Sequence, residues 1–444
     1  MYIYKYFCTF APENEPKRCI IVAIKGIHKS ELVRNSARLL TANVVAQAIG
    51  LLVYPVLTRL YAPEDFGLLN LFMSIGGIGV LLATMAYHDA IVLPKEESRA
   101  RALMQVCGLC VAAVMVLFAL TIPLAKPIAA LFETPDLAQW WWLMPLYIGG
   151  MGLWNAVSNL FIRTKSFRRI SVYQIAQSVL NAGGKAGLGA LGWIPGGLIM
   201  PTIFSPVLAI GISLLNGGKR LVKDLFRWDG QAVREAAKEY RNFPFYSCPR
   251  MLISYLSNNL PFLLLTPVFG LTQTGYFGMA MTLAYRPIQM VVQSVYQVLY
   301  QRTTQLVNEG QRILPLLRRF VLRAVLVIAP VWVVLYGILP WLTAWLLGDE
   351  WRVCGEYIRL LLPWLMMVVL TITINYLPDI FGRQRTMMWI EILYLVLRVS
   401  ALLAGIYMQS VQWAIGLYAA SGTLILTGEL IWFLVLAYRH DRKL

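Results

Sequence analysis

Five charged residues lie inside long apolar stretches of the sequence: Lys185, Arg286, Arg398, Glu391 and Glu429. At the centre of a bilayer each charge costs roughly 2.5–3.5 kcal/mol on insertion scales, so each is a candidate functional residue. The three cations predict a binding site for an anion. For Arg398 the alternative is a structural ion pair with Glu429. Glu391 and Glu429 are also candidates to carry a coupling proton or sodium ion.

Uncharged polar side chains repeat at helical spacing beside these charges, which places them on single helix faces. Because lipid-facing surfaces hold few polar groups, these faces predict the lining of an internal cavity, although interhelical hydrogen bonds are the alternative. The predicted polar lining consists of Asn43, Gln47, Gln174, Gln177, Asn181, Asn258, Gln289, Gln293 and Tyr394.

The elements that carry these residues are membrane-spanning helices. The chain of 444 residues is 58% hydrophobic and 14% charged, whereas a soluble protein carries roughly 25% charged residues. A span needs roughly 20 mostly apolar residues, and lipid leaves no partner for an open backbone group, so each span must be a helix. The sequence therefore predicts an all-α integral membrane protein. Its apolar stretches, about twelve by this criterion, lie near residues 38–58, 67–87, 102–124, 139–160, 171–191, 196–215, 246–266, 277–299, 320–340, 357–378, 387–407 and 412–437.

The basic residues are distributed asymmetrically. The net charge is +17, but most of the 39 Lys and Arg residues fall at one side of the predicted spans. Only Arg59, Lys126, Arg352 and Arg359 fall in loops on the other side. By the positive-inside rule we expect both termini to be cytoplasmic, in a protein of the inner membrane. No segment forms a folded basic face, so nucleic acid is not an expected partner.

The sequence divides into two similar halves of six spans. Phe66-Gly67 at the start of the second span matches Phe277-Gly278 at the start of the eighth, and the polar residues fall on corresponding spans. Such parallel repeats predict two pseudo-symmetric lobes with substrate bound between them. The predicted division is a cytoplasmic tail at 1–35, an N-lobe at 36–216, a cytoplasmic linker at 217–245, a C-lobe at 246–437 and a second cytoplasmic tail at 438–444.

Three other features have plain structural explanations. Cys107 and Cys110 form a CxxC pair inside an apolar span, where free cysteine packs as a small hydrophobe. Pro63-Glu64-Asp65 suits the first turn of a helix. The three histidines are scattered, so no metal site and no cofactor are expected.

Two stretches resemble the bacterial oligosaccharide flippases of the MOP superfamily, to which the MATE drug exporters also belong. They are LTRLYAPEDFGLLNLFMSIGGIGVLLATMAYHDAIVLP at 57–94 and residues 242–302, which begin NFPFYSCPRMLISYL. The resemblance covers roughly residues 36–437 and implies a V-shaped pair of six-helix bundles. It also implies a function: moving undecaprenyl-diphosphate-linked repeat units across the inner membrane for O-antigen, capsule or exopolysaccharide. The implied partners are the lipid-linked oligosaccharide and a polysaccharide polymerase or co-polymerase.

Two alternatives stand beside this expectation. A drug or metabolite exporter of the same superfamily requires an acidic, ion-binding interior, for which only Glu391 and Glu429 qualify. A membrane-embedded glycan polymerase or ligase requires a cluster of catalytic groups on a sizeable outer loop. The longest predicted outer loop, near 339–355, holds only Asp349 and Glu350 as acids in its polar part, so the protein is not expected to be an enzyme.

Overall fold

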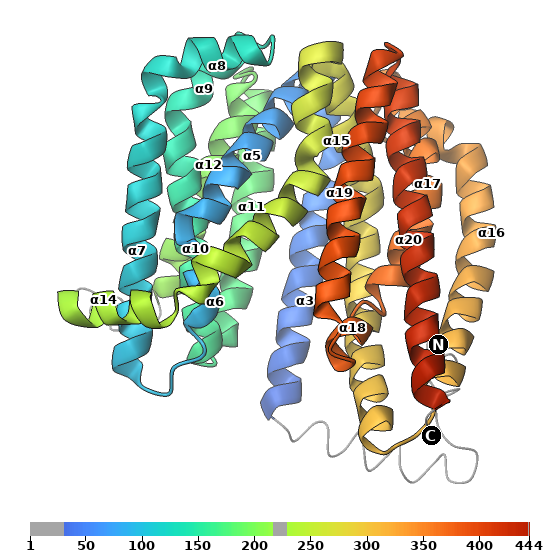
Figure 1. Cartoon of the computed structure of the whole chain (residues 1–444). Coiled ribbons are helices and arrows are strands. Elements are labelled where there is room, and N and C mark those ends of the chain that lie inside the picture. The colour runs from blue at the N-terminus through green and yellow to red at the C-terminus, as the bar shows by residue number, and fades with distance from the viewer. Residues whose placement is uncertain (1–30, 216–228, 443) are drawn as a thin grey trace.

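The computed structural model describes residues 31–215, 229–442 and 444, and every regular element within these ranges is a helix (Figure 1). The all-α prediction is confirmed. The long helices are α3 (Glu31–Leu52), α5 (Pro63–Thr84), α7 (Glu97–Leu120), α10 (Met144–Arg163), α11 (Phe167–Ala190), α12 (Gly196–Leu214), α15 (Cys248–Asn308), α16 (Leu314–Leu347), α17 (Arg352–Ile372), α19 (Gln384–Tyr407) and α20 (Val411–Asp441). The short ones are α4 (Tyr54–Leu60), α6 (Tyr87–Ala90), α8 (Ala125–Leu131), α9 (Asp136–Trp140), α14 (Gly230–Glu239) and α18 (Leu377–Ile380).

Nine helical segments of the described residues are long and apolar enough to cross a membrane. Each predicted apolar stretch overlaps helical residues. However, α15 counts as one segment although it bends, and α10 and α11 fall outside the nine because they are more polar. The number of twelve crossings therefore stays a prediction.

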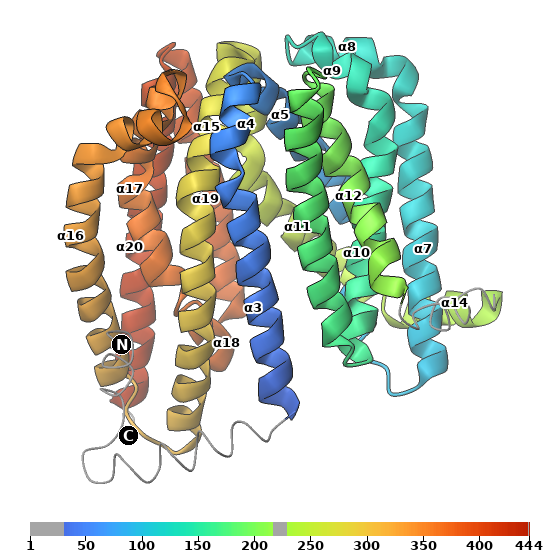
Figure 2. The same ribbon diagram turned by 180° about the vertical axis from the view of Figure 1, so that it is seen from behind.

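The long helices form two groups that converge at one end and separate at the other (Figures 1 and 2). One group contains α5, α7, α10, α11 and α12, and the other contains α16, α17, α19 and α20. The start of α3 and the C-terminus lie at the separated end, which we call the terminal end; the opposite end, where α8 and α9 lie, is the far end. Most of the predicted tail at 1–35 and residues 217–228 of the predicted linker at 217–245 lie outside the described residues, and the domain boundaries stay a prediction.

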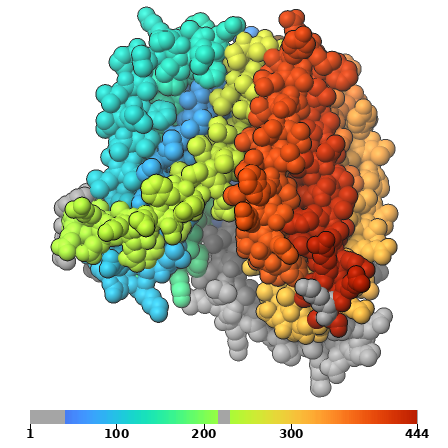
Figure 3. Space-filling view, viewed as in Figure 1, coloured from blue at the N-terminus to red at the C-terminus, as the bar shows by residue number. Residues whose placement is uncertain are grey.

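Helix α15 connects the two groups. It bends at Gly270, whose φ of 82° lies in the left-handed region that glycine adopts most readily. The first arm, residues 248–269, runs across the outside of the first group (Figure 3). There the hydroxyl of Tyr255 donates to the carbonyl oxygens of Met73 and Ser74 at 3.1 and 3.2 Å. The second arm, residues 271–308, returns within the second group.

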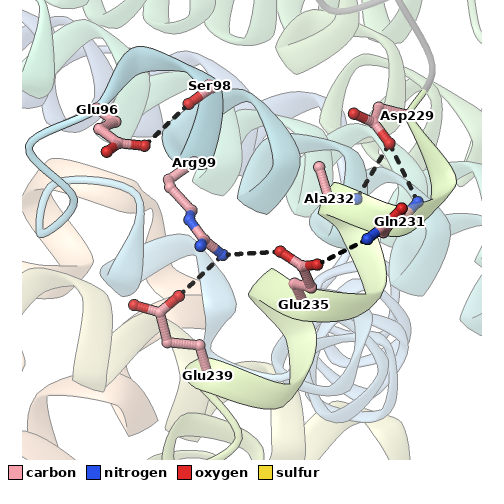
Figure 4. Close-up of polar contacts among 8 residues, drawn as sticks. All are labelled: Glu96, Ser98, Arg99, Asp229, Gln231, Ala232, Glu235 and Glu239. Atoms are coloured by element: carbon pink, nitrogen blue, oxygen red, sulfur yellow. Dashed lines mark hydrogen bonds and ion pairs between the residues drawn. The ribbon is translucent and has the colours of Figure 1, made fainter.

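Helix α14 attaches the base of the first arm to α7 (Figure 4). The Asp229 carboxylate accepts bonds from two main-chain N–H groups of the first turn, both at 3.1 Å, which caps the helix. The Arg99 guanidinium of α7 lies 3.5 Å from the Glu235 carboxylate and 3.2 Å from that of Glu239. The apolar side of α14 packs into a cluster that also contains Cys107. The base of α15 is thereby fixed to the first group.

Candidate functional site

A cavity of about 710 Å³ lies between the two groups of helices. Its walls are α3 and α11 on one side and the second arm of α15 on the other, with further side chains from α5, α10 and α12. The hydroxyl of Ser178 on α11 donates to the carbonyl of Ala46 on α3, so these two helices form one continuous wall. The cavity therefore lies across the boundary between the groups, and the sequence predicts that the substrate binds at such a boundary.

The structure brings two of the three predicted cations into this cavity. Lys185 of α11 and Arg286 of α15 both line it, and the two side chains are close enough for their positive charges to repel each other. Neither side chain has an ion-pair partner among the described residues, and none of the lining residues is acidic. Two unneutralised cations facing one space create a positive potential that favours an anionic ligand.

Seven of the predicted uncharged residues line the same cavity. On α11, Lys185 lies near the far-end terminus of the helix. Gln174 lies eleven residues nearer the terminal end, which is about 16 Å at 1.5 Å per residue. Amide side chains offer both hydrogen-bond donors and acceptors, as the hydroxyl groups of a sugar require. The seven residues are Asn43, Gln47, Gln174, Gln177, Asn181, Gln289 and Gln293.

At the far end the cavity is closed where α5 crosses the second arm of α15. Glycines allow the two backbones to approach closely: a Cβ at Gly67 would lie 2.0 Å from the Leu271 carbonyl oxygen. A Cβ at Gly275 would lie 1.9 Å from the Pro63 carbonyl oxygen. We call the crossing at Gly67 and Gly275 the far-end closure. At the terminal end, by contrast, the two groups of helices separate (Figure 2).

Polar and aromatic contacts surround the far-end closure. The carboxylate of Glu64 accepts a bond of 2.9 Å from the Thr272 hydroxyl across the crossing. The Asp65 carboxylate accepts from the Ala62 N–H at 2.9 Å, which confirms the predicted cap for Asp65, whereas Glu64 bonds between helices instead. Phe66 packs edge-on against Trp351, with ring centroids 5.3 Å apart.

The third predicted cation, Arg398 of α19, does not line the cavity. Its side chain is completely buried, and its guanidinium lies 3.8 Å from the ring centroid of Tyr418, 4.7 Å from that of Tyr394 and 5.0 Å from that of Trp364. One bond of 3.4 Å reaches the side-chain oxygen of Asn258 on the first arm of α15. Arg398 is thus held by aromatic rings, and Tyr394 and Asn258 belong to this second cluster rather than to the lining of the cavity.

The alternative of an ion pair between Arg398 and Glu429 is wrong, since the described residues contain no such pair. Glu429 is buried on α20, and Glu391 is half-buried on α19, where the positive charge of Arg250 acts on its carboxylate. Neither acid lines the cavity. Their assignment as coupling residues stays a prediction.

The sequence reasoning did not find Tyr61, Asn70 and Thr202. Asn70 and Thr202 line the cavity, and the Tyr61 hydroxyl donates to the Lys185 carbonyl oxygen at 2.8 Å. One signal was available for part of this region. The repeated Phe-Gly pair contains Gly67 and Gly278, and both glycines lie where α5 and α15 cross.

Comparison with known proteins gives a consistent set of relatives. The sequence profile of the family described as polysaccharide biosynthesis protein matches residues 56–356. The succinoglycan biosynthesis transport protein ExoT of Rhizobium meliloti (strain 1021) is 21% identical over 370 residues, which cover 79% of this chain and 69% of ExoT.

Solved structures give the same fold. An inward-facing multidrug resistance MATE family transporter of the MOP superfamily matches with a TM-score of 0.67 at 13% identity, over 89% of this chain and 96% of that one. The lipid II flippase MurJ in an inward closed conformation also gives 0.67, at 12% identity over 90% of each chain. The all-α transporter fold expected from the sequence is confirmed.

Proposed function

Because the chain belongs to the polysaccharide biosynthesis protein family, a MOP-type group of membrane transporters, we propose that it is a flippase for lipid-linked oligosaccharides. The proposed substrate is an undecaprenyl-diphosphate-linked repeat unit for O-antigen, capsule or exopolysaccharide. The unit passes from the cytoplasmic to the periplasmic leaflet of the inner membrane by alternating access. The translocated unit is then used by a polysaccharide polymerase or co-polymerase.

The observation that carries this proposal is the pairing of two kinds of group in one cavity. Lys185 and Arg286 provide unneutralised positive charge, which suits a diphosphate, and the amides nearer the terminal end suit the hydroxyl groups of a glycan. A cationic drug finds no counter-charge among the lining residues. The cavity thus favours the flippase over a drug exporter, although both fit the fold.

The direction of transport follows from the orientation proposed for the chain. Among the described basic residues outside the cavity and the Arg398 cluster, only Arg59, Lys126, Arg352 and Arg359 lie toward the far end, so the terminal end is assigned to the cytoplasm. The end at which the two groups separate then faces the leaflet in which the repeat unit is assembled. An anion moving outward gains about 2.3 kcal/mol per charge per 100 mV from a potential that is negative inside.

The first test is deletion of the gene in its own host, followed by analysis of undecaprenyl-diphosphate oligosaccharides and of the membrane side on which they lie. We expect loss of the surface glycan and accumulation of the intermediate on the cytoplasmic side. Normal surface glycan with no trapped intermediate would refute the proposal. A growth-inhibition panel on the overexpressing strain would then test the drug exporter.

The second test returns variants to the deletion strain. Lys185→Gln and Arg286→Gln, separately and together, are expected to lower glycan export, with the double variant the most severe. Arg302→Gln is the matched control, because Arg302 lies on the same helix α15 but outside the cavity. Equal export by the double variant and the control, at equal protein levels, would exclude the two cations as the anion site.

A further inference from the structure

Tyr61 lies at the corner between α4 and α5, and its side chain connects two regions described above. It is 3% exposed, and its hydroxyl donates to the main-chain oxygen of Lys185, a residue 124 positions away. The acceptor is the backbone of a cavity residue rather than its ammonium group. Tyr61 therefore acts on the position of Lys185 and leaves its charge free for a ligand.

The tyrosine ring occupies a slot that two glycines leave open. A Cβ at Gly189, at the end of α11, would lie 2.7 Å from the Tyr61 ring and hydroxyl. A Cβ at Gly197, at the start of α12, would lie 2.2 Å from the hydroxyl oxygen. Both contacts are shorter than any side chain tolerates, so the α11–α12 hairpin is shaped around this one hydroxyl. This close fit fixes the far end of α11, where Lys185 lies.

The other side of Tyr61 faces the far-end closure. Its ring packs edge-on against Phe66 at 6.3 Å between centroids, and Phe66 in turn contacts Trp351 of the second group. Two residues after Tyr61, the carbonyl of Pro63 forms the contact with Gly275. The same corner of the chain thus touches both the cation site and the closure.

We propose that Tyr61 is a positioning residue for Lys185 and that it couples anion binding in the cavity to the far-end closure. The proposal rests on the proposed function, because it takes the ligand of Lys185 to be the diphosphate group. A change in the closure moves the α4–α5 corner, and the Tyr61 hydroxyl passes that change to α11. Coupling is reciprocal, so an anion that binds at Lys185 changes the state of the closure.

The test uses the full-length protein in lipid nanodiscs with inorganic diphosphate as the probe. Spin labels on Lys126→Cys and Asp349→Cys, both exposed at the far end on opposite groups, report the distance across the closure. The background lacks the native cysteines. We expect diphosphate to bind and to shift this distance in the otherwise unchanged protein. Tyr61→Phe keeps the ring in its slot but removes the hydrogen bond to Lys185. We expect it to weaken diphosphate binding about fivefold, as for the loss of one net hydrogen bond, and to abolish most of the distance shift.

Tyr376→Phe is the matched control, because Tyr376 is also buried and its hydroxyl also makes a 2.8 Å hydrogen bond, to Thr303 of α15 outside the cavity, and it should behave as the parent. Gly197→Ala is a second variant. It retains the Tyr61 hydroxyl but pushes it away from the Lys185 carbonyl, so it should resemble Tyr61→Phe. If Tyr61→Phe binds diphosphate and shifts the distance as the parent does, the coupling is refuted while the anion site stands. If the parent itself does not bind diphosphate, the anion site and the coupling both fall.

Discussion

The far-end closure makes one substitution especially informative. Gly275→Ala places a Cβ 1.9 Å from the Pro63 carbonyl oxygen and 3.1 Å from the Gly67 nitrogen. Both neighbours are backbone atoms, which cannot turn aside as a flexible side chain does. The helices must separate by about 1 Å or more to reach an allowed contact, and overpacking of this kind costs about 1–3 kcal/mol. The cost applies only while α5 and α15 remain crossed.

Under the proposed alternating access, this cost shifts the population away from the state that is closed at the far end. A penalty of about 1–3 kcal/mol corresponds to a factor of roughly 5–150. The assay is labelling of a single cysteine at Gln289→Cys, inside the cavity, by an impermeant maleimide added from the far side. We expect the labelling rate to rise by this factor in Gly275→Ala, up to the limit set by complete opening.

Gly428→Ala is the control, since a Cβ at Gly428 of α20 meets no atom within 4 Å. It should label as slowly as the parent while gaining a little helix stability. If Gly275→Ala folds normally and labels no faster than Gly428→Ala, the crossing of α5 and α15 is not what keeps the far side closed. The reasoning from the glycine contacts would then be refuted.

Three further predictions concern regions outside the cavity. Tyr418→Leu removes the ring nearest to Arg398 and should lower the free energy of unfolding by about 2 kcal/mol. The loss should be smaller in a protein that already carries Arg398→Leu, and additive losses in this double-mutant cycle would disprove the cation–π contact. Arg99→Ala should lower the free energy of unfolding by less than about 1 kcal/mol, because the ion pairs of Arg99 are partly exposed. In thermal unfolding, Glu235→Ala should have an effect of similar size, and both effects should disappear at high salt. Burial lowers the pKa of His88 although the Asp89 carboxylate beside it raises that pKa, so the unfolded chain takes up a proton before the folded chain does. The free energy of unfolding should therefore fall as the pH drops below about 6.5. His88→Gln should flatten this pH dependence of thermal stability, and an unchanged profile in the variant would contradict the prediction.

The sequence was sufficient to predict which polar helix faces line the cavity. Lys185 and Arg286 are far apart in the chain, yet each lies on a helical face that also carries amides, and both faces line one cavity. The physical reason is strong: a polar face in an apolar span must turn away from lipid, and the interior of the protein is the only other environment. The same argument found the all-α class and the apolar stretches.

The sequence was not sufficient to predict contacts in which a polar group meets an aromatic ring or in which two stretches of backbone meet. Arg398 was expected in the cavity or beside Glu429, but Trp364, Tyr394 and Tyr418 surround it instead. Aromatic residues are common in apolar spans, so nothing in their spacing distinguishes a ring that holds a guanidinium from one that packs on leucine. Close backbone crossings such as that at Gly275 likewise depend on which two helices meet, which spacing within one helix does not reveal.

The path of α15 has a consequence for recombination between relatives. The first arm belongs by sequence to the second half, but Tyr255 bonds to Met73 and Ser74 of the first. A chimera joined in the linker before α14 would therefore pair the first arm of one protein with the α5 of another. A junction at Gly270 keeps those partners together, but it separates the second arm from α5 at the far-end closure and Asn258 of the first arm from Arg398. Either junction therefore divides the contacts of α15 between two parents, so chimeras of this family should need matched substitutions where α5 and α15 meet.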